Sequence, residues 1–314
     1  MLSNPARLWR KFSQWGGLLL ASILLTVVVF HQLRTLSRLP SSAAGSSATA
    51  SLHQSTVAVS SPVVGQSDLY QQGFSRQVAQ LRRLYQSAPK LSVEALMDRE
   101  AAEADSYASK MFASLDPPTQ YRIDADPTNF GDRFEQDVNE KPLQNKLLVV
   151  LHETASAASS AVNAVLTPHP RDEDQISYHA VIRLNGEILY LVDPDKRAYG
   201  AGNSAFKGAS GVETVQTNKN LKSSVNNFAY HISLETPADG YHQHPEHSGY
   251  SAAQYMALAW LIARSGVSDD RITTHEAVDR SGERQDPRRF DMAWLQKDLA
   301  LNRTEVFLGG ANLP

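Results

Sequence analysis

The sequence predicts an α/β fold with a mixed central β-sheet flanked by helices, preceded by an N-terminal membrane segment and a helical extension. Three observations predict this class. The short apolar run 147–151 is typical of a buried strand. Asn185-Gly186, between two strand-like segments, indicates an antiparallel hairpin. Residues 252–264 place apolar side chains on one helical face, which indicates at least one packed helix.

The remaining elements follow from the same patterns. We expect the hairpin strands at residues 178–183 and 188–192, and a further strand at 228–234. Gly266 follows the expected helix as a stop signal. The segment 271–274 is short and strand-like. A buried strand beside an antiparallel hairpin makes the expected sheet a mixed one.

The N-terminus has the pattern of an export signal. Basic residues flank the uncharged stretch 15–30, which at 16 residues is short for a spanning helix of roughly 17–25 residues. Small residues at 41–50 resemble a signal-peptidase site, so a cleaved signal peptide competes with a retained anchor. We favour an anchor in the inner membrane. Either interpretation puts the rest of the chain outside the cytoplasm, in the periplasm or secreted after cleavage.

Composition shifts divide the chain into five expected segments. They are a membrane anchor or signal peptide (1–40), a flexible linker (41–66), a helical extension and connection (67–140), a catalytic domain (141–303) and a C-terminal tail (304–314). The linker is rich in Ser, Ala, Val and Gly and has too few large apolar groups to offset chain entropy. Helical spacing of apolar residues begins after it.

Charge and cysteine content exclude several functions. A formal net charge of −3 and a pI near 6.4 give no basic footprint, so we expect no nucleic acid partner. The sequence contains no cysteine, which excludes disulfides, thiolate metal sites and a cysteine nucleophile. Any metal must therefore bind through histidine and carboxylate.

His152, His275 and Asp286 form a candidate metal site. His152 ends the apolar run, His275 follows the strand-like segment 271–274, and Asp286 lies in a polar loop beyond it. This order allows all three to project from one sheet edge. Catalytic zinc takes three such ligands and leaves a fourth position for water. On spacing alone, a hydrogen-bonded structural role for the histidines competes with this interpretation.

Several motifs occur together, and their order and spacing are specific. They are Leu147-Leu-Val-Val-Leu-His-Glu-Thr154, Ile176-Ser-Tyr-His-Ala-Val-Ile182 with Asn185-Gly186, Asn226-Asn-Phe228 before Ile232-Ser-Leu-Glu235, Thr274-His275, Gln285-Asp286-Pro287 and Phe290-Asp291. With them, residues 146–301, roughly half of the chain, resemble the zinc-dependent N-acetylmuramoyl-L-alanine amidases of the type-2 amidase family, which includes the peptidoglycan recognition proteins.

The resemblance implies that His152, His275 and Asp286 hold zinc, and that the enzyme cleaves the amide between N-acetylmuramic acid and the L-alanine of the stem peptide. Zinc lowers the pKa of bound water to about 7 and polarises the carbonyl, as an inert amide requires. Glu235 then corresponds to a carboxylate that takes the proton from this water. Tyr178 corresponds to a hydroxyl that orients water or donates to the oxyanion. A solvated strand end and core packing are their competing interpretations.

Two departures from the family concern catalysis and substrate contact. Arg284 stands where relatives commonly have lysine, so it fits charge stabilisation and not proton transfer. Gly200 stands where relatives often place a substrate-contacting histidine. Tyr199 and Asn203 are the candidates to line the substrate groove instead, although a turn explains the neighbouring glycines equally well. Ser233 replaces a small residue usual in relatives and is interpreted as packing.

Further histidines and glutamates are interpreted conservatively. His242, His244 and His247 precede a helix, in a loop where solvent or capping contacts are commoner than a second metal. His179 is expected on the strand face opposite Tyr178, in the core or on the surface, and His231 has the same status. Glu153 and Glu276 each follow a candidate ligand, as partners that support the ligand or as solvated groups.

The sequence therefore predicts a membrane-tethered zinc amidase acting on peptidoglycan or muropeptides. Two alternatives stay open. One is a non-catalytic peptidoglycan-binding module that retains the amidase fold, suggested by Gly200 and Arg284. The other is a zinc amidase directed at a different acyl-amino acid.

Overall fold

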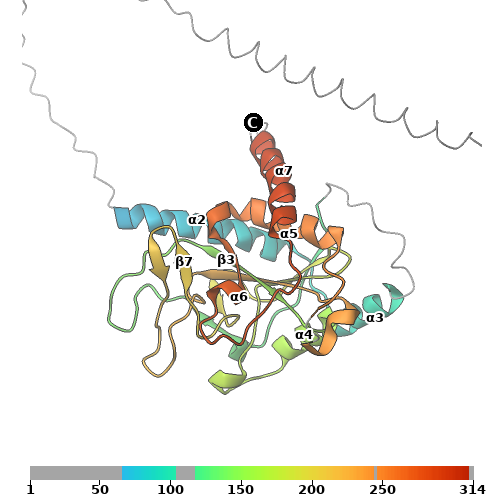
Figure 1. The fold of residues 1–314 in the computed structure, drawn as a ribbon, viewed down its shortest axis with the longest axis horizontal. Coiled ribbons are helices and arrows are strands. Elements are labelled where there is room, and N and C mark those ends of the chain that lie inside the picture. The colour runs from blue at the N-terminus through green and yellow to red at the C-terminus, as the bar shows by residue number, and fades with distance from the viewer. Residues whose placement is uncertain (1–65, 104–116, 244–245, 311–314) are drawn as a thin grey trace, which may run out of the picture. The chain divides into compact units, whose positions relative to one another are not determined.

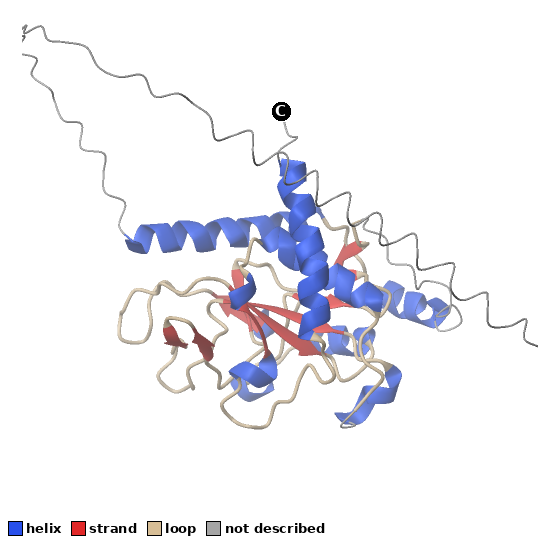
Figure 2. Ribbon diagram, turned by 45° about the horizontal axis from the view of Figure 1, so that its top comes forward, coloured by secondary structure: helices blue, strands red, loops and turns tan. Residues whose placement is uncertain are grey.

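The computed structural model describes residues 66–103, 117–243 and 246–310. A six-stranded mixed sheet lies at its centre (Figures 1 and 2). The strands, in spatial order, are β1 (Gln120–Arg122), β5 (Ile188–Tyr190), β4 (Ala180–Ile182), β9 (Ala229–Leu234), β3 (Leu148–Glu153) and β10 (Ile272–Thr274). β4 and β5 are antiparallel, and every other neighbouring pair is parallel. The expectation of a mixed sheet is confirmed.

Helices cover both faces of this sheet (Figure 1). On one face lie α2 (Gln66–Ser87), α5 (Ala252–Ser265) and α7 (Met292–Gly310), and on the other lie α3 (Val93–Glu103) and α4 (Ala158–Leu166). The smaller elements are β2 (Phe130–Asp132) paired with β6 (Lys196–Ala198), β7 (Phe206–Gly208) paired with β8 (Gly211–Glu213), helix α6 (His275–Val278), and 3-10 turns at Pro127–Asn129, Asp172–Asp174, Ala238–Gln243 and Asp269–Arg271.

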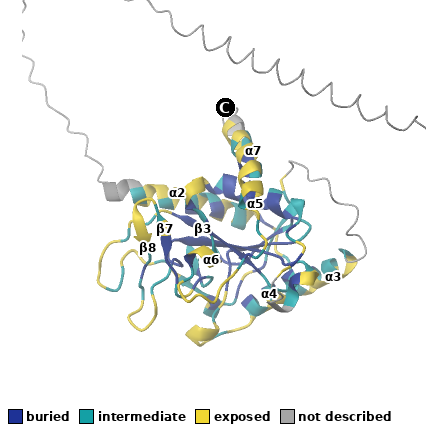
Figure 3. Ribbon diagram, viewed as in Figure 1, coloured by how far each residue is buried: buried dark blue, intermediate teal, exposed yellow. Residues whose placement is uncertain are grey.

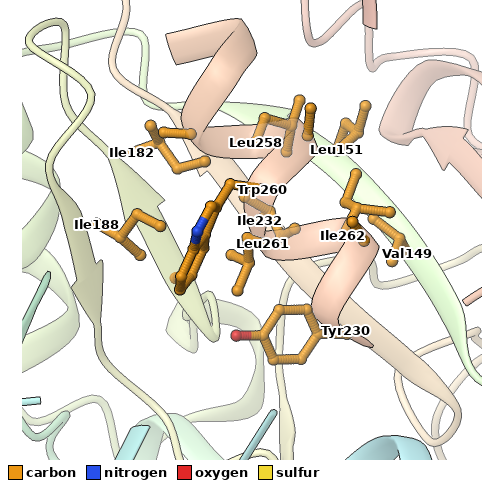
Figure 4. Close-up of a cluster of buried hydrophobic side chains, with 14 of the residues drawn as sticks. Val149, Leu151, Ile182, Ile188, Tyr230, Ile232, Leu258, Trp260, Leu261 and Ile262 are labelled. Atoms are coloured by element: carbon orange, nitrogen blue, oxygen red, sulfur yellow. The ribbon is translucent and has the colours of Figure 1, made fainter. Parts of the chain in front are cut away.

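The largest core cluster fills the space between the sheet and α5. Val149 and Leu151 of β3 lie with Ile232 of β9 against Leu258 and Ile262 of α5 (Figure 4). All six residues of β3 and of β9 are buried, as expected for strands covered on both faces, and the buried sheet contrasts with the exposed loops (Figure 3). The strand that carries His152 is thus enclosed on both faces.

Local signals in the sequence explain where elements begin and end. Ser251 and Gln254 form a capping box at the start of α5, and Gly266 ends the helix in the left-handed conformation (φ 68°). Gly186 adopts φ 85° in the β4–β5 hairpin, which a glycine accommodates without strain. These features confirm the helix expected at 252–264 and the hairpin centred on Asn185-Gly186.

The structure shows how two of the expected segments pack. Residues 67–140 contribute to the same core and sheet as the residues that follow, because Leu81 of α2 lies in the main core and β1 pairs with β5 in the central sheet. Residues 304–310 continue α7 instead of forming a tail. In residues 67–140, apolar side chains that looked like part of a spacer in the sequence are packed in the core.

The expected membrane segment, residues 1–40, and the linker, 41–66, lie outside the described residues except for Gln66. No helix in the described part of the chain is long and apolar enough to cross a membrane.

Candidate metal centre

The strand order brings His152, His275 and Asp286 together. His152 lies near the end of β3, and His275 follows the end of β10. β3 and β10 are parallel neighbours, so their carboxyl ends meet at one sheet edge. Asp286 returns to this edge on the loop after α6, where its backbone carbonyl accepts a hydrogen bond from the N–H of Glu276 at 3.0 Å.

Both histidines direct Nδ1 toward the Asp286 carboxylate. His152 Nδ1 lies 3.2 Å from Oδ2 of Asp286, and His275 Nδ1 lies 3.1 Å from the same oxygen and 2.9 Å from Oδ1. One ligand atom from each residue lies within 4.8 Å of the other two. The three side chains therefore present two imidazole nitrogens and a carboxylate oxygen toward one point.

Burial and mutual contact set the protonation of this triplet. Burial lowers the pKa of His152 to about 4, so its imidazole is neutral at physiological pH. Burial acts to raise the pKa of Asp286, but its side-chain contacts with His152 and His275 outweigh burial and hold that pKa below its usual value. A neutral imidazole and an ionised carboxylate are the forms that bind metals. Two histidines and one carboxylate also match a catalytic zinc site in number and type.

A cavity of about 990 Å³ opens beside the triplet and is lined in part by His275 and Asp286. Four residues singled out from the sequence also line it: Tyr178, Tyr199, Asn203 and Arg284. The Tyr178 ring centroid lies 5.1 Å from that of His152, and burial raises the pKa of this tyrosine, which stays protonated at neutral pH. The Arg284 side chain is exposed.

Glu235 is placed differently from the sequence expectation. One carboxylate oxygen accepts the backbone N–H of Ala158 at 2.9 Å, and the other accepts that of Leu184 at 2.8 Å. Glu235 is not among the residues that line the 990 Å³ cavity. Glu235 directly follows β9, and its carboxylate satisfies backbone N–H groups at the first turn of α4 and at the hairpin loop. Its expected role as proton acceptor has no geometric support.

The sequence interpretation missed the role of His231. Its Nδ1 lies 2.9 Å from His152 Nε2, and both side chains are fully buried. The expectation that His231 is a core residue is met, but its contact with a candidate ligand was not foreseen. The pairing of β3 with β9 explains this contact. Val150 and His231 are register partners, and His152 lies two residues after Val150 on the same face of β3.

His247 and Glu153 also differ from the conservative interpretation. Glu153 is buried and accepts a hydrogen bond from the Tyr250 hydroxyl at 3.0 Å. His247 Nε2 lies 3.3 Å from the same carboxylate, so His247 is a buried neighbour of Glu153 and not a solvated loop residue. Glu276 is exposed, while the side chains of His242 and His244 lie outside the described part of the structure.

Comparison with known proteins gives one family match and several similar solved structures. Residues 143–289 match the family model of N-acetylmuramoyl-L-alanine amidases. No curated protein matches the sequence significantly. Among solved structures, the chain is similar to a selenomethionine derivative of AmpD (22% identity, TM-score 0.38, covering 61% of this chain and 98% of that one). The chain is also similar to AmpDh3 of Pseudomonas aeruginosa in complex with an anhydromuramic pentapeptide (20% identity, TM-score 0.35, covering 49% of this chain and 59% of that one). A third similar structure is the endolysin LysCS of Clostridium intestinale (16% identity, TM-score 0.35, covering 60% of this chain and 99% of that one).

The region 143–289 therefore belongs to the type-2 N-acetylmuramoyl-L-alanine amidase family, as its motifs led us to expect.

Proposed function

We propose that this protein is a zinc-dependent hydrolase of the amide bond between N-acetylmuramic acid and L-alanine in peptidoglycan. The observation that carries the proposal is the convergence of His152, His275 and Asp286, whose ligand atoms lie within 4.8 Å of one another beside a 990 Å³ cavity. Membership of residues 143–289 in the amidase family supports the same reaction class.

The metal would be held by Nδ1 of His152, Nδ1 of His275 and the Asp286 carboxylate. The protonation states described above fit this assignment, as does the open cavity on one side of the triplet. A zinc ion there would act as a Lewis acid toward the amide carbonyl and the attacking water.

Residues of the cavity wall would bind the substrate and stabilise developing charge. Tyr178 keeps its proton at neutral pH, so its hydroxyl is suited to donate a hydrogen bond to the developing oxyanion and not to act as a base. Arg284 adds a permanent positive charge at the same cavity. Tyr199 offers an aromatic face to a sugar ring, and Asn203 an amide to a peptide carbonyl.

The proposed substrate lies outside the cytoplasmic membrane, so this activity requires export. The basic and uncharged pattern of residues 1–40 supplies an export signal, and we propose a periplasmic, membrane-tethered enzyme on that basis. Cell fractionation tests it, because the anchor interpretation predicts the full-length protein in the membrane fraction with protease access from the periplasmic side only. Recovery in the cytoplasmic fraction would contradict it.

The placement of Glu235 favours a second candidate function. With this carboxylate bound to two backbone amides, the expected proton acceptor is missing from the cavity wall. A peptidoglycan-binding module that retains the amidase fold needs no such group. The two candidates differ in turnover, since only the hydrolase generates new amino termini.

The experiment compares two full-length variants, Asp286→Asn and Glu276→Gln, which remove one carboxylate each. Glu276 directly follows His275 but is exposed, so it serves as the matched control. We expect Asp286→Asn to lose both bound zinc and release of L-alanine amino termini from purified peptidoglycan, while Glu276→Gln keeps both. Wall binding by the wild type without any release would favour the binding module, and full activity of Asp286→Asn would refute the site assignment.

A further inference from the structure

The imidazole of His152 contacts a second histidine, His231. On the side away from Asp286, His152 Nε2 lies 2.9 Å from Nδ1 of His231, which stands on the adjacent parallel strand β9. Both side chains have no exposed surface. The contact is thus a hydrogen bond within the protein interior, between a candidate metal ligand and a residue outside the ligand set.

We propose that His231 is a positioning residue that holds His152 with Nε2 protonated and Nδ1 directed at the metal position. The proposal rests on the proposed metal site, and it adds a residue that neither the family match nor the ligand geometry assigns. A neutral imidazole carries one N–H. Coordination through Nδ1 leaves the proton of His152 on Nε2, and His231 Nδ1 is the acceptor that lies in reach.

An acceptor behind the ligand is a general requirement of metal sites. A ligating histidine almost always donates its other N–H to a carboxylate, a carbonyl or water, and the partner fixes both the tautomer and the ring orientation. In this protein an imidazole takes that place. The buried environment offers His152 Nε2 no access to solvent, so loss of His231 would leave a buried donor unpaired.

The surrounding structure holds His231 in the required position. Its backbone N–H donates to Nδ1 of His179 at 2.9 Å, and His179 Nε2 lies 3.1 Å from the carbonyl oxygen of Lys196. His179 is therefore held by two backbone groups, and its ring stacks on His231 at an interplanar angle of 11°. These contacts hold the backbone of His231 and the plane of its ring in the position in which Nδ1 contacts His152.

Gly200 provides the space that the His231 ring occupies. A Cβ atom at Gly200 would lie 2.7 Å from both Cγ and Nδ1 of His231, closer than such atoms approach. The glycine that replaces a histidine of many relatives is thus explained by packing, because the space beside this position is filled from β9. A Cβ atom at Gly202, two residues on, would point into open space, with no described residue beyond its chain neighbours within 4 Å.

One further observation argues that His231 does more than fill space. Its Nε2 is buried and has no hydrogen-bond partner in the described part of the structure. An unpaired buried nitrogen is costly, and an apolar side chain would avoid the cost. A histidine here is explained by what its other nitrogen does for His152.

The test compares His231→Leu with His231→Asn in the full-length protein. The two side chains are similar in size, but only Asn places an acceptor near the position of His231 Nδ1. Zinc affinity is measured by competition with a chelating dye. We expect His231→Leu to bind zinc about 10–100-fold more weakly than wild type, and His231→Asn to recover most of that loss. Equal affinities of the Leu and Asn variants would overturn the proposal.

A second pair of variants avoids removal of the histidine. The added methyl group of Gly200→Ala would clash with the His231 ring and is expected to weaken zinc binding. Gly202→Ala adds the same methyl group into open space and should leave zinc binding unchanged. Nitrogen-15 spectra of the zinc-loaded wild type show directly which ring nitrogen of His152 carries the proton, and we expect it on Nε2. A proton on Nδ1 would overturn the proposal. Failure of the wild type to bind zinc would instead refute the proposed function, and this inference with it.

Discussion

Glu153 and Arg288 form a buried ion pair that joins the strand carrying His152 to the loop carrying Asp286. Glu153 follows His152 on β3, and Arg288 comes two residues after Asp286 in the loop. The side chains are 4% and 9% exposed, and Arg288 Nη2 also donates to the carbonyl of Gly240 at 2.9 Å. The pair therefore fixes the position of the loop that brings Asp286 to the strand edge.

Removal of one member of this pair should destabilise the domain. Arg288→Met leaves Glu153 charged and buried, and we expect the free energy of unfolding to fall by about 3 kcal/mol. Arg289→Met is the matched control, because Arg289 is adjacent to Arg288 but exposed. This substitution should change the free energy of unfolding by less than about 0.5 kcal/mol. Urea denaturation of both proteins makes the comparison. Equal stability of the two variants would show that the pair contributes nothing to the loop.

The two tyrosines of the cavity should affect different kinetic constants. Tyr178→Phe removes a protonated hydroxyl beside His152, and we expect kcat to fall about 100-fold with zinc content unchanged. Tyr199 is proposed to offer its aromatic face to a sugar ring of the substrate, so Tyr199→Leu, which removes that face, should raise KM and leave kcat nearly constant. Steady-state kinetics on a soluble muropeptide separate the two effects. An unchanged kcat in Tyr178→Phe would remove this residue from the proposed mechanism.

Glu235 should prove to be structural. Glu235→Ala leaves the backbone N–H groups of Ala158 and Leu184 without their acceptor, which we expect to cost about 1–3 kcal/mol of stability. Zinc affinity should stay within about twofold of wild type, because no ligand is touched. Denaturation and zinc titration test both expectations. A normally stable Glu235→Ala protein with a severely reduced kcat would restore its assignment as proton acceptor.

Asp279 should make the stability of the loop dependent on acid pH. Burial acts to raise the pKa of its carboxyl, but hydrogen bonds from backbone N–H groups, including those of Ser281 and Gly282, outweigh it and lower the pKa to about 2. A lowered folded-state pKa contributes stability above the unfolded value of 3.8 that is lost as pH falls toward 2. The stability difference between wild type and Asp279→Asn should therefore shrink between about pH 5 and pH 2 in urea denaturation of metal-free protein. A constant difference would contradict this assignment.

Elements with strong local patterns could be predicted from the sequence. The run 147–151, the Asn185-Gly186 hairpin and the helix at 252–264 each combine side-chain periodicity with a specific turn or cap, and all three occur in the structure. The packing of residues 67–140 against the rest of the fold could not be predicted, because local patterns do not show which strand pairs with which. Pairing of β1 with β5 joins residues far apart in the sequence.

In the candidate site, too, some residues could be predicted from the sequence and others could not. His152, His275 and Asp286 could be grouped because motif order reflects the ends of neighbouring strands. His231 and Glu235 could not be placed, because their contacts depend on strand register and on backbone groups that come from other elements. Strict alternation along β9 could have shown that His231, Ser233 and Glu235 share one face. It could not have shown which of them reaches His152.

The central claim is metal-dependent hydrolysis of the muramoyl–alanine bond. The most direct measurement is the release of new amino termini from purified peptidoglycan by the full-length protein, with identification of the residue that carries them, before and after chelation and after addition of zinc. The proposed function predicts L-alanine termini that disappear with the chelator and return with zinc. A folded, zinc-loaded protein that binds peptidoglycan and releases no L-alanine termini would contradict it.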